Sequence, residues 1–221
     1  MLMLDSVEIT RDRGLSPEVL ARMATSDDEA VRLAVATHPH VSPDTLDVLA
    51  RDASIAVRQS VARSKYTSSE TLVRLATDAD TGVCVGVARN EKTPLSVLTE
   101  MARSDTKRIR REVASNTAMP VDVLDTLADD EDSLVRCKVV WNTSTPPETL
   151  ARMATDADKE VRLWVANNQA TPVETLDELA KSLDRRVRQM AYHTLRILSS
   201  KASSADTDDS TVDVLVSRTR S

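Results

Sequence analysis

The stretch from Thr145 to Asn168, TPPETLARMATDADKEVRLWVANN, holds two short amphipathic segments joined by a small acidic turn. Three of its apolar positions recur every 26 residues in seven copies. The three columns are Leu20, Leu46, Leu72, Leu98, Leu124, Leu150 and Leu176; Ala24, Ala50, Ala76, Ala102, Ala128, Ala154 and Ala180; and Val31, Val57, Val83, Ile109, Val135, Val161 and Val187. Such a repeat is typical of a solenoid, in which each small unit buries its apolar face only against its neighbours.

Each repeat is predicted to contain two helices. Thr145 and Glu148 have the spacing of a capping box with Pro146 at N1, which marks the start of the first helix. The second helix is expected to begin at an N-cap residue whose side chain accepts from free amides of the first turn. These caps are Asp28, Ser54, Asp80, Thr106, Asp132, Asp158 and Asp184. At about 100° per residue, Leu33, Ala34, Thr37 and their equivalents fall on an outward arc.

Composition and charge narrow the possible classes of protein. The 221 residues are 41% hydrophobic but only 2% aromatic, with no Phe, which favours thin layers of Leu, Val and Ala over one thick core. The net charge of −6 disfavours a general nucleic-acid or anionic-membrane binder. Cys84 and Cys137 form no CxxC pair, and no secretory signal or apolar span of membrane length occurs. We therefore expect a soluble cytoplasmic protein.

The repeat register defines three segments of the chain. Residues 1–15 do not keep the register and are expected to form an N-terminal cap. Residues 16–198 form the repeat solenoid. Residues 199–221 are polar and rich in Ser and Asp, which predicts a flexible tail. Within the solenoid, Gly82 and Gly86 lie in the second helix of repeat 3, where each costs about 1 kcal/mol relative to Ala. We expect a soft spot or a kink there.

An arginine occupies one position of the second helix in six of the seven repeats. This ladder is Arg32, Arg58, Arg110, Arg136, Arg162 and Arg188, and Cys84 interrupts it. A phosphate backbone would be one possible ligand for such a row. The position falls inside the apolar arc, however, four residues after the N-cap acid. We therefore interpret the ladder as structural, with (i, i+4) pairing between the N-cap Asp and the Arg.

The outward arc is the better candidate for function. Its Trp141 and Trp164 are the only tryptophans, and they should be near neighbours because they belong to adjacent repeats on one helical face. Exposed Trp beside Arg and Lys has the composition of an interface hot spot. The candidate partner-binding residues are Trp141, Trp164, Arg63, Arg89, Arg111 and Lys138. Packing of one or both rings over a gap between repeats is an equally good interpretation from sequence.

No motif in the chain indicates catalysis. There is no Gly-rich phosphate loop, nucleophile elbow or Ser/His/Asp set, and the His-x-His of His38 and His40 is weak evidence for a metal. The sequence therefore predicts no enzyme, no cofactor and no metal site. The basic run from Lys107 to Arg111 is expected to be a solvated helix face, with a small anion or RNA patch as the alternative.

The unit reads L-x-x-[LM]-A-x-D-x-D-x-x-V-R-x-x-V-A-x-N-x-x-T-P, as in Asp158-Lys-Glu-Val161-Arg162. In this it resembles the leucine-rich repeat variant family, which is similar to HEAT repeats. The resemblance covers residues 16–197 and implies a right-handed superhelical α-solenoid of seven 26-residue two-helix repeats, in a family whose units serve as interaction surfaces. One member type carries a cysteine-ligated iron–sulfur cluster near its N-terminus. No cysteine precedes Cys84 here, so that cofactor does not carry over.

These observations lead to one main functional hypothesis and two rivals. The main one is a non-enzymatic scaffold that binds a protein partner on the exposed face of the second helices. The first rival is a nucleic-acid-binding HEAT-like protein of the DNA-repair glycosylase type, with a local basic groove. The second is scaffolding by end-to-end self-association. The identity of a protein partner is beyond the sequence.

Overall fold

A computed structural model describes Ile9, Asp12 and residues 14–218, with side chains as far as Lys201. Within these residues it contains fourteen α-helices, α2 to α15, and no strand. The first helices of the repeats are α2 (Pro17–Met23), α4 (Pro43–Leu49), α6 (Ser69–Leu75), α8 (Leu95–Met101), α10 (Val121–Leu127), α12 (Pro147–Met153) and α14 (Val173–Leu179). The second helices are α3 (Glu29–Thr37), α5 (Ile55–Arg63), α7 (Thr81–Arg89), α9 (Lys107–Ala114), α11 (Ser133–Trp141), α13 (Lys159–Asn167) and α15 (Arg185–Arg218). The predicted all-α solenoid of seven two-helix repeats is confirmed.

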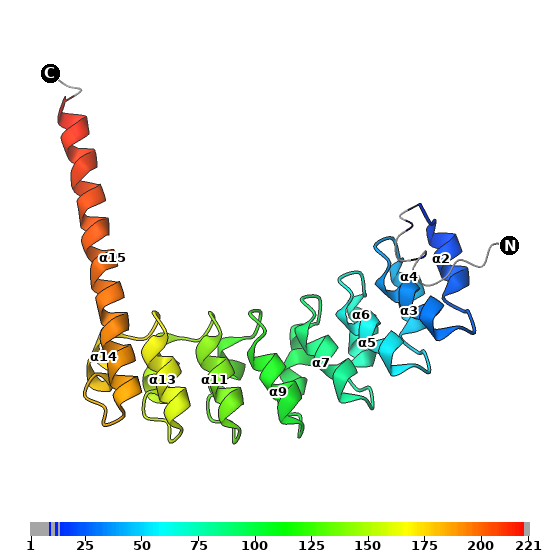
Figure 1. Cartoon of the computed structure of the whole chain (residues 1–221), viewed down its shortest axis with the longest axis horizontal. Helices are drawn as coiled ribbons and strands as arrows, with labels where there is room; N and C mark the ends of the chain where they lie inside the picture. Colours follow the sequence, from blue (N-terminus) through cyan, green and yellow to red (C-terminus); the bar gives the residue numbers. More distant parts are fainter. Residues whose placement is uncertain (1–8, 10–11, 13, 219–221) are drawn as a thin grey trace. The chain divides into compact units, whose positions relative to one another are not determined.

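The helices fall into two compact units, one up to Leu127 and one from Ala128. In the N-terminal unit each second helix packs on the next, α3 on α5, α5 on α7 and α7 on α9. In the C-terminal unit α11 packs on α13, and α13 packs on the first part of α15 (Figure 1). The second helices thus form the continuous layer of each unit. Most residues of the expected N-terminal cap, 1–15, lie outside the described part of the chain, and the cap stays a prediction.

The repeating leucines form the core that the period predicts. All seven are at most 1% exposed, and Val35 and its equivalents as far as Val165 are 0% exposed. Each leucine lies in a first helix and faces the second-helix layer. Full burial of one such side chain stabilises a repeat by roughly 1.5–3 kcal/mol. Since no seven-residue helix folds alone, this burial against neighbours holds the stack together.

The first helices begin one residue later than the capping-box prediction, which is wrong. The N-caps are Ser16, Ser42 and Ser68 in the early repeats, and Pro146 holds that place before α12. The threonine before this N-cap instead donates a hydrogen bond to a carbonyl of the preceding second helix. The hydroxyl of Thr145 donates to the carbonyl of Val139 at 2.6 Å, and Thr67, Thr93 and Thr171 make the same bond to Val61, Val87 and Val165. The threonine therefore fixes the turn between repeats.

The second helices begin where the sequence predicts. Asp28, Ser54, Asp80, Asp132 and Asp158 are N-caps whose side chains accept from first-turn amides. Thr106 occupies the same position without a side-chain bond to the helix.

The exposed arc of these helices is narrower than expected. Thr37 and its equivalents are exposed, but Leu33 is half-buried, and Cys137 and Leu163 at the same position are buried. The outward placement of that position is wrong, and so is that of Ala34, which is buried. Each second helix has another second helix on its flank.

The second helix of repeat 3 is regular and closely packed, so the expected kink is wrong, and the soft spot stays a prediction. α7 is a regular helix from Thr81 to Arg89, and Gly82 and Gly86 are both buried. A Cβ built on Gly86 would lie 2.8 Å from the Cβ of Ala62, in α5. Real Cβ atoms essentially never come this close to another atom, so glycine is needed where α5 and α7 approach.

The last helix extends through most of the segment that the sequence assigned to a tail. α15 runs to Arg218, and so includes most of residues 199–221. Residues 199–218 contain neither Gly nor Pro, and nothing in them stops the helix. The flexibility of this segment stays a prediction. Among the described residues, no helix is long and apolar enough to cross a membrane.

Candidate partner-binding site

The arginine ladder joins neighbouring repeats through paired hydrogen bonds. The Nε of Arg136 donates to Oδ2 of Asp156 at 2.7 Å, and its Nη2 donates to Oδ1 at 2.9 Å. Arg32 bonds Asp52, and Arg58 bonds Asp78, in the same way. The Nη1 of each arginine donates to carbonyls of its own interhelical turn. The predicted (i, i+4) partner is wrong, since the carboxylate comes from the next repeat, 20 positions later.

The Arg–Asp pair is missing at two places in the ladder. Where Cys84 replaces the arginine, Ser104 replaces the aspartate, so both charges are missing together. The Cys84 thiol instead lies 3.2 Å from the carbonyl of Asp78. Farther along, Arg162 keeps its bonds to the carbonyls of Asp156 and Ala157, but Ser182 stands where the carboxylate would be. These arginines stabilise the stack and are not a free cationic row.

A second connection joins each repeat to the one before it. The side-chain amide of Asn168 donates to the carbonyl of Val140 at 2.6 Å, and Asn90 and Asn116 reach back in the same way to Ala62 and Ala88. These amides satisfy carbonyls at the end of the preceding second helix, which fixes the spacing of neighbouring repeats.

The two tryptophans are in contact, as predicted. The ring centroids of Trp141 and Trp164 are 4.6 Å apart, and the rings meet at 84°, an edge-to-face pair. Trp141 ends α11, and 54% of its surface is exposed, whereas Trp164 on α13 is half-buried. The Nζ of Lys138, one turn earlier, lies 5.1 Å from the centroid of the Trp141 ring. Three of the six candidate residues are therefore together.

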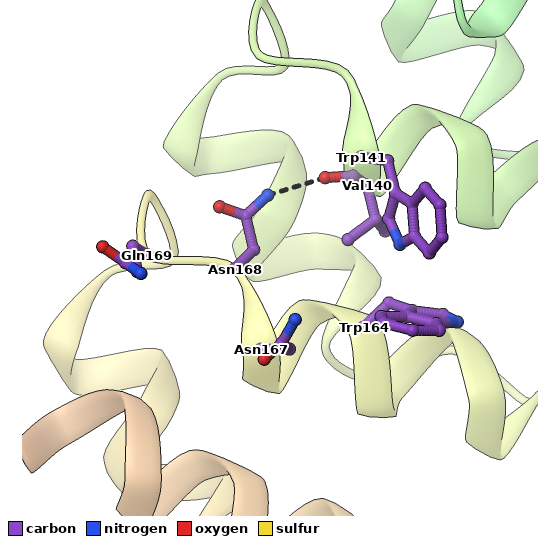
Figure 2. Close-up of a pocket in the computed structure, with 6 residues that line it drawn as sticks. All are labelled: Val140, Trp141, Trp164, Asn167, Asn168 and Gln169. Atoms are coloured by element: carbon purple, nitrogen blue, oxygen red, sulfur yellow. Dashed lines mark hydrogen bonds between the residues drawn. The ribbon is translucent and has the colours of Figure 1, made fainter. Parts of the chain in front are cut away.

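These rings form one side of a surface pocket of about 400 Å³. Val140, Asn167, Asn168 and Gln169 line the rest of it, and Figure 2 shows Asn167 and Gln169 across the space from the indoles. The Oε1 of Gln169 accepts a hydrogen bond from Nζ of Lys201 at 2.6 Å. No Asp or Glu lines the pocket, so its walls combine apolar rings with amide groups.

The remaining candidates lie in the N-terminal unit, which is described by itself. Arg63 is exposed at the end of α5. Arg89 forms a paired ion pair with Glu112, at 2.6 and 2.7 Å, so its charge is neutralised. Arg111 is half-buried on α9, within the basic run that begins at Lys107.

Neither cysteine is an activated nucleophile. Both are buried free thiols, and burial raises the pKa of Cys137 to about 11. The thiol therefore stays protonated at neutral pH. In the described part of the chain, no group of His, Cys, Asp or Glu is arranged to hold a metal ion.

Sequence reasoning missed two features of this region. The first is the set of aspartates that completes the ladder, although Asp52, Asp78 and Asp156 recur at the repeat period. Their joint absence with the arginine, at Cys84 and Ser104, was the available signal. The second is Lys201, which was assigned to the tail. The absence of a helix stop after Ile197 could have placed it on α15.

Comparison with known proteins supports the repeat architecture. A solved leucine-rich repeat variant, described as having a novel repetitive structural motif, is 26% identical, with 86% of this chain and 75% of that chain covered at a TM-score of 0.67. YibA of Escherichia coli matches at 13% identity and a TM-score of 0.51, over 86% of this chain and 95% of its own, which shows the fold alone. A designed armadillo repeat protein for modular peptide recognition is 16% identical over 86% of this chain and 91% of that one. Its TM-score of 0.28 is too low for its function to be transferred.

No family model matches the sequence, and no curated protein is similar to it. The resemblance that the repeat unit predicts is nevertheless confirmed by the solved structure with the same repeat type. The chain is an α-helical repeat solenoid similar to the leucine-rich repeat variant proteins.

Proposed function

We propose that this protein is a non-enzymatic scaffold that binds a protein partner on the exposed face of its second helices, around Trp141 and Trp164. The observation that carries the proposal is the exposure of the Trp141 ring beside a pocket, in a chain with only two tryptophans. A monomer gains little from leaving an indole in water. Trp with flanking cations is the composition in which interface hot spots are enriched.

The nucleic-acid alternative has weaker support. The basic residues that such a groove would use are Arg63, Arg89, Lys107, Arg108 and Arg111. Arg89 is already neutralised by Glu112, and Arg111 is half-buried. Phosphate-driven binding through many cations should weaken steeply between about 50 and 200 mM salt, whereas docking on the indoles with one or two charged contacts should weaken far less. We infer a cytoplasmic location from the two free thiols, which a reducing compartment preserves.

The experiment is affinity capture with the whole chain, followed by mass spectrometry of the captured proteins. The double variant Trp141→Ala, Trp164→Ala should lose the partner while its circular dichroism stays unchanged. Tyr192→Ala is the matched control, because Tyr192 is 57% exposed on α15 but does not line the pocket. Capture that survives the double variant, or that depends equally on Tyr192, would refute the proposed surface.

A further inference from the structure

We propose that the pocket beside Trp141 and Trp164 takes an acidic segment of the protein partner, with an apolar side chain on the indoles and a carboxylate toward Lys138. This inference rests on the proposed function and names the chemistry of the partner. It depends on three observations: the hydrogen-bonding groups of the pocket, the charges of the surrounding helices and the geometry of the ring pair.

The pocket offers many donors and few acceptors. Neither indole N–H has a hydrogen-bond partner among the described residues, and the Asn167 amide has none either. Gln169 uses its oxygen to accept from Lys201, so its NH₂ group remains to donate. Lys138 does not line the pocket, but its ammonium group lies over the Trp141 ring beside it, and no lining residue is acidic. An occupant that satisfies these groups must bring oxygen acceptors, which carboxylates and peptide carbonyls supply.

In the C-terminal unit, the second helices carry mostly basic residues and the first helices mostly acidic ones. The basic residues of α11, α13 and α15 as far as Lys201 are Arg136, Lys138, Lys159, Arg162, Arg185, Arg186, Arg188, Arg196 and Lys201. The acidic residue among them is Glu160, which is paired with Arg186, and the charge of Arg136 is neutralised by Asp156 from the turn before α13. The first helices α12 and α14 show the reverse, with Glu148, Glu174, Asp177 and Glu178 against Arg152. The layer that carries the tryptophans is therefore the basic one, although the whole chain is acidic.

The acids nearest to this layer lie at the opposite end of the helices. Asp132 and Asp158 cap the N-termini of α11 and α13, whereas Trp141 is the last residue of α11. A nine-residue helix is about 13 Å long. That separation exceeds the screening length of about 8 Å at physiological salt, so Lys138 acts on a ligand at the rings with little opposition. An acidic segment therefore meets a favourable potential at the pocket.

The ring geometry favours a peptide over a nucleic acid. Single-stranded nucleic acids bind by stacking successive bases on open aromatic faces. Trp141 and Trp164 instead meet at 84°, edge to face, so the pair does not offer two parallel faces. Lys138 also lies over the Trp141 ring. The right-angled corner between the rings fits an aliphatic side chain, which needs contact from two directions.

The test uses a phage-displayed library of random peptides, selected on the whole chain. Selected sequences that lack Trp are synthesised and titrated against the protein while its tryptophan emission is followed. Because both tryptophans of the chain line the pocket, the emission reports on this site directly. The expected consensus is an apolar residue flanked by Asp or Glu.

Four variants separate the inference from the proposed function. Trp141→Ala with Trp164→Ala should abolish binding of the selected peptides. Lys138→Glu should weaken binding about tenfold or more, and Lys138→Arg should restore most of it. Lys181→Glu, a charge reversal in the turn that follows α14, should have no effect.

Neutral or basic peptides that need the tryptophans but ignore Lys138→Glu would overturn the acidic partner and leave the docking surface intact. The absence of any tryptophan-dependent peptide would overturn both. Both would also be overturned if single-stranded oligothymidylate shifted the tryptophan emission and no peptide did.

Discussion

Arg136 holds Asp156 of the next repeat by two parallel hydrogen bonds of 2.7 and 2.9 Å. Side-chain exposures of 15% and 8% place the pair largely away from solvent. The same pair recurs as Arg32 with Asp52 and Arg58 with Asp78. A paired hydrogen bond of this kind fixes the register of one repeat on the next, because it is directional. Apolar contacts have no such directional preference.

The ladder makes stability depend on acid pH. Hydrogen bonding to Arg32 and Arg58 lowers the pKa of Asp52 and Asp78 in the folded protein. The stability from each pair is therefore complete above the ordinary Asp pKa of about 3.9, and it is lost as pH falls through the lowered pKa. Asp78→Asn should cost about 1–2 kcal/mol near neutral pH. Urea unfolding across pH should also show a flatter decline below about pH 4 for this variant. An unchanged acid profile would contradict the role of the pair.

The missing pair in repeat 3 can be restored. Cys84→Arg alone places a charge at a buried site, and Ser104→Asp alone adds an acid with no guanidinium. Together they should reproduce the bonds that Arg58 makes with Asp78. We expect the double variant to be more stable than the two single changes predict, by about 1 kcal/mol of coupling. A double-mutant cycle in urea measures it, and strict additivity would mean that the pair does not form.

The second interruption of the arginine ladder, at Arg162, can be repaired by one substitution. Its guanidinium is held by the carbonyls of Asp156 and Ala157, with Ser182 at the place of the carboxylate. Ser182→Asp should complete the fork and raise the free energy of unfolding by about 1 kcal/mol. The gain should disappear in an Arg162→Met background. A gain that persists there would have to come from another contact.

The two buried glycines of α7 should respond differently to alanine. Helix propensity alone favours Ala by about 1 kcal/mol at both. At Gly86 the new Cβ would meet the Cβ of Ala62 at 2.8 Å, so Gly86→Ala should be destabilising by about 1–3 kcal/mol. At Gly82 the new Cβ would meet the side-chain ends of Gln59 and of the N-cap Asp80, and both can shift at the expense of the hydrogen bond between them. Gly82→Ala should therefore cost less. Thermal unfolding ranks the two, and equal effects would show that the contact with Ala62 is not tight.

The sequence predicted the fold from features that are local and periodic. The burial of Leu150 and Leu176 follows from the 26-residue spacing, and the second-helix caps follow from Asp and Ser at fixed positions. The ladder partner was predicted wrongly, because an (i, i+4) contact was assumed before the contact between repeats was considered. Cys137 and Leu163 are buried, although the helical angle places them on the outward arc. The reason is the same, because the pattern of one helix does not reveal which of its flanks another helix covers.

The candidate site was predicted only in part. The two tryptophans lie in adjacent repeats on one helical face, which predicts that they are neighbours. The structure confirms this, with 4.6 Å between the ring centroids. The share of each ring that stays exposed depends on neighbouring side chains such as Lys138, and the sequence left it open. Gln169 and Lys201 join the pocket from a turn and from an extended helix, and no spacing rule brings them together.

The free energy of unfolding of the variant Trp141→Ala, Trp164→Ala tests the central claim most directly, because that claim requires the rings to serve a partner and not the core. An aromatic pair contributes about 0.5–1.5 kcal/mol beyond its buried area. The buried part of each ring is lost as well, so we expect a total loss of about 3–5 kcal/mol, with an unchanged circular dichroism spectrum. Truncation of one core Trp costs about 3–5 kcal/mol, so a loss of about 6–10 kcal/mol for the two rings together would contradict the claim.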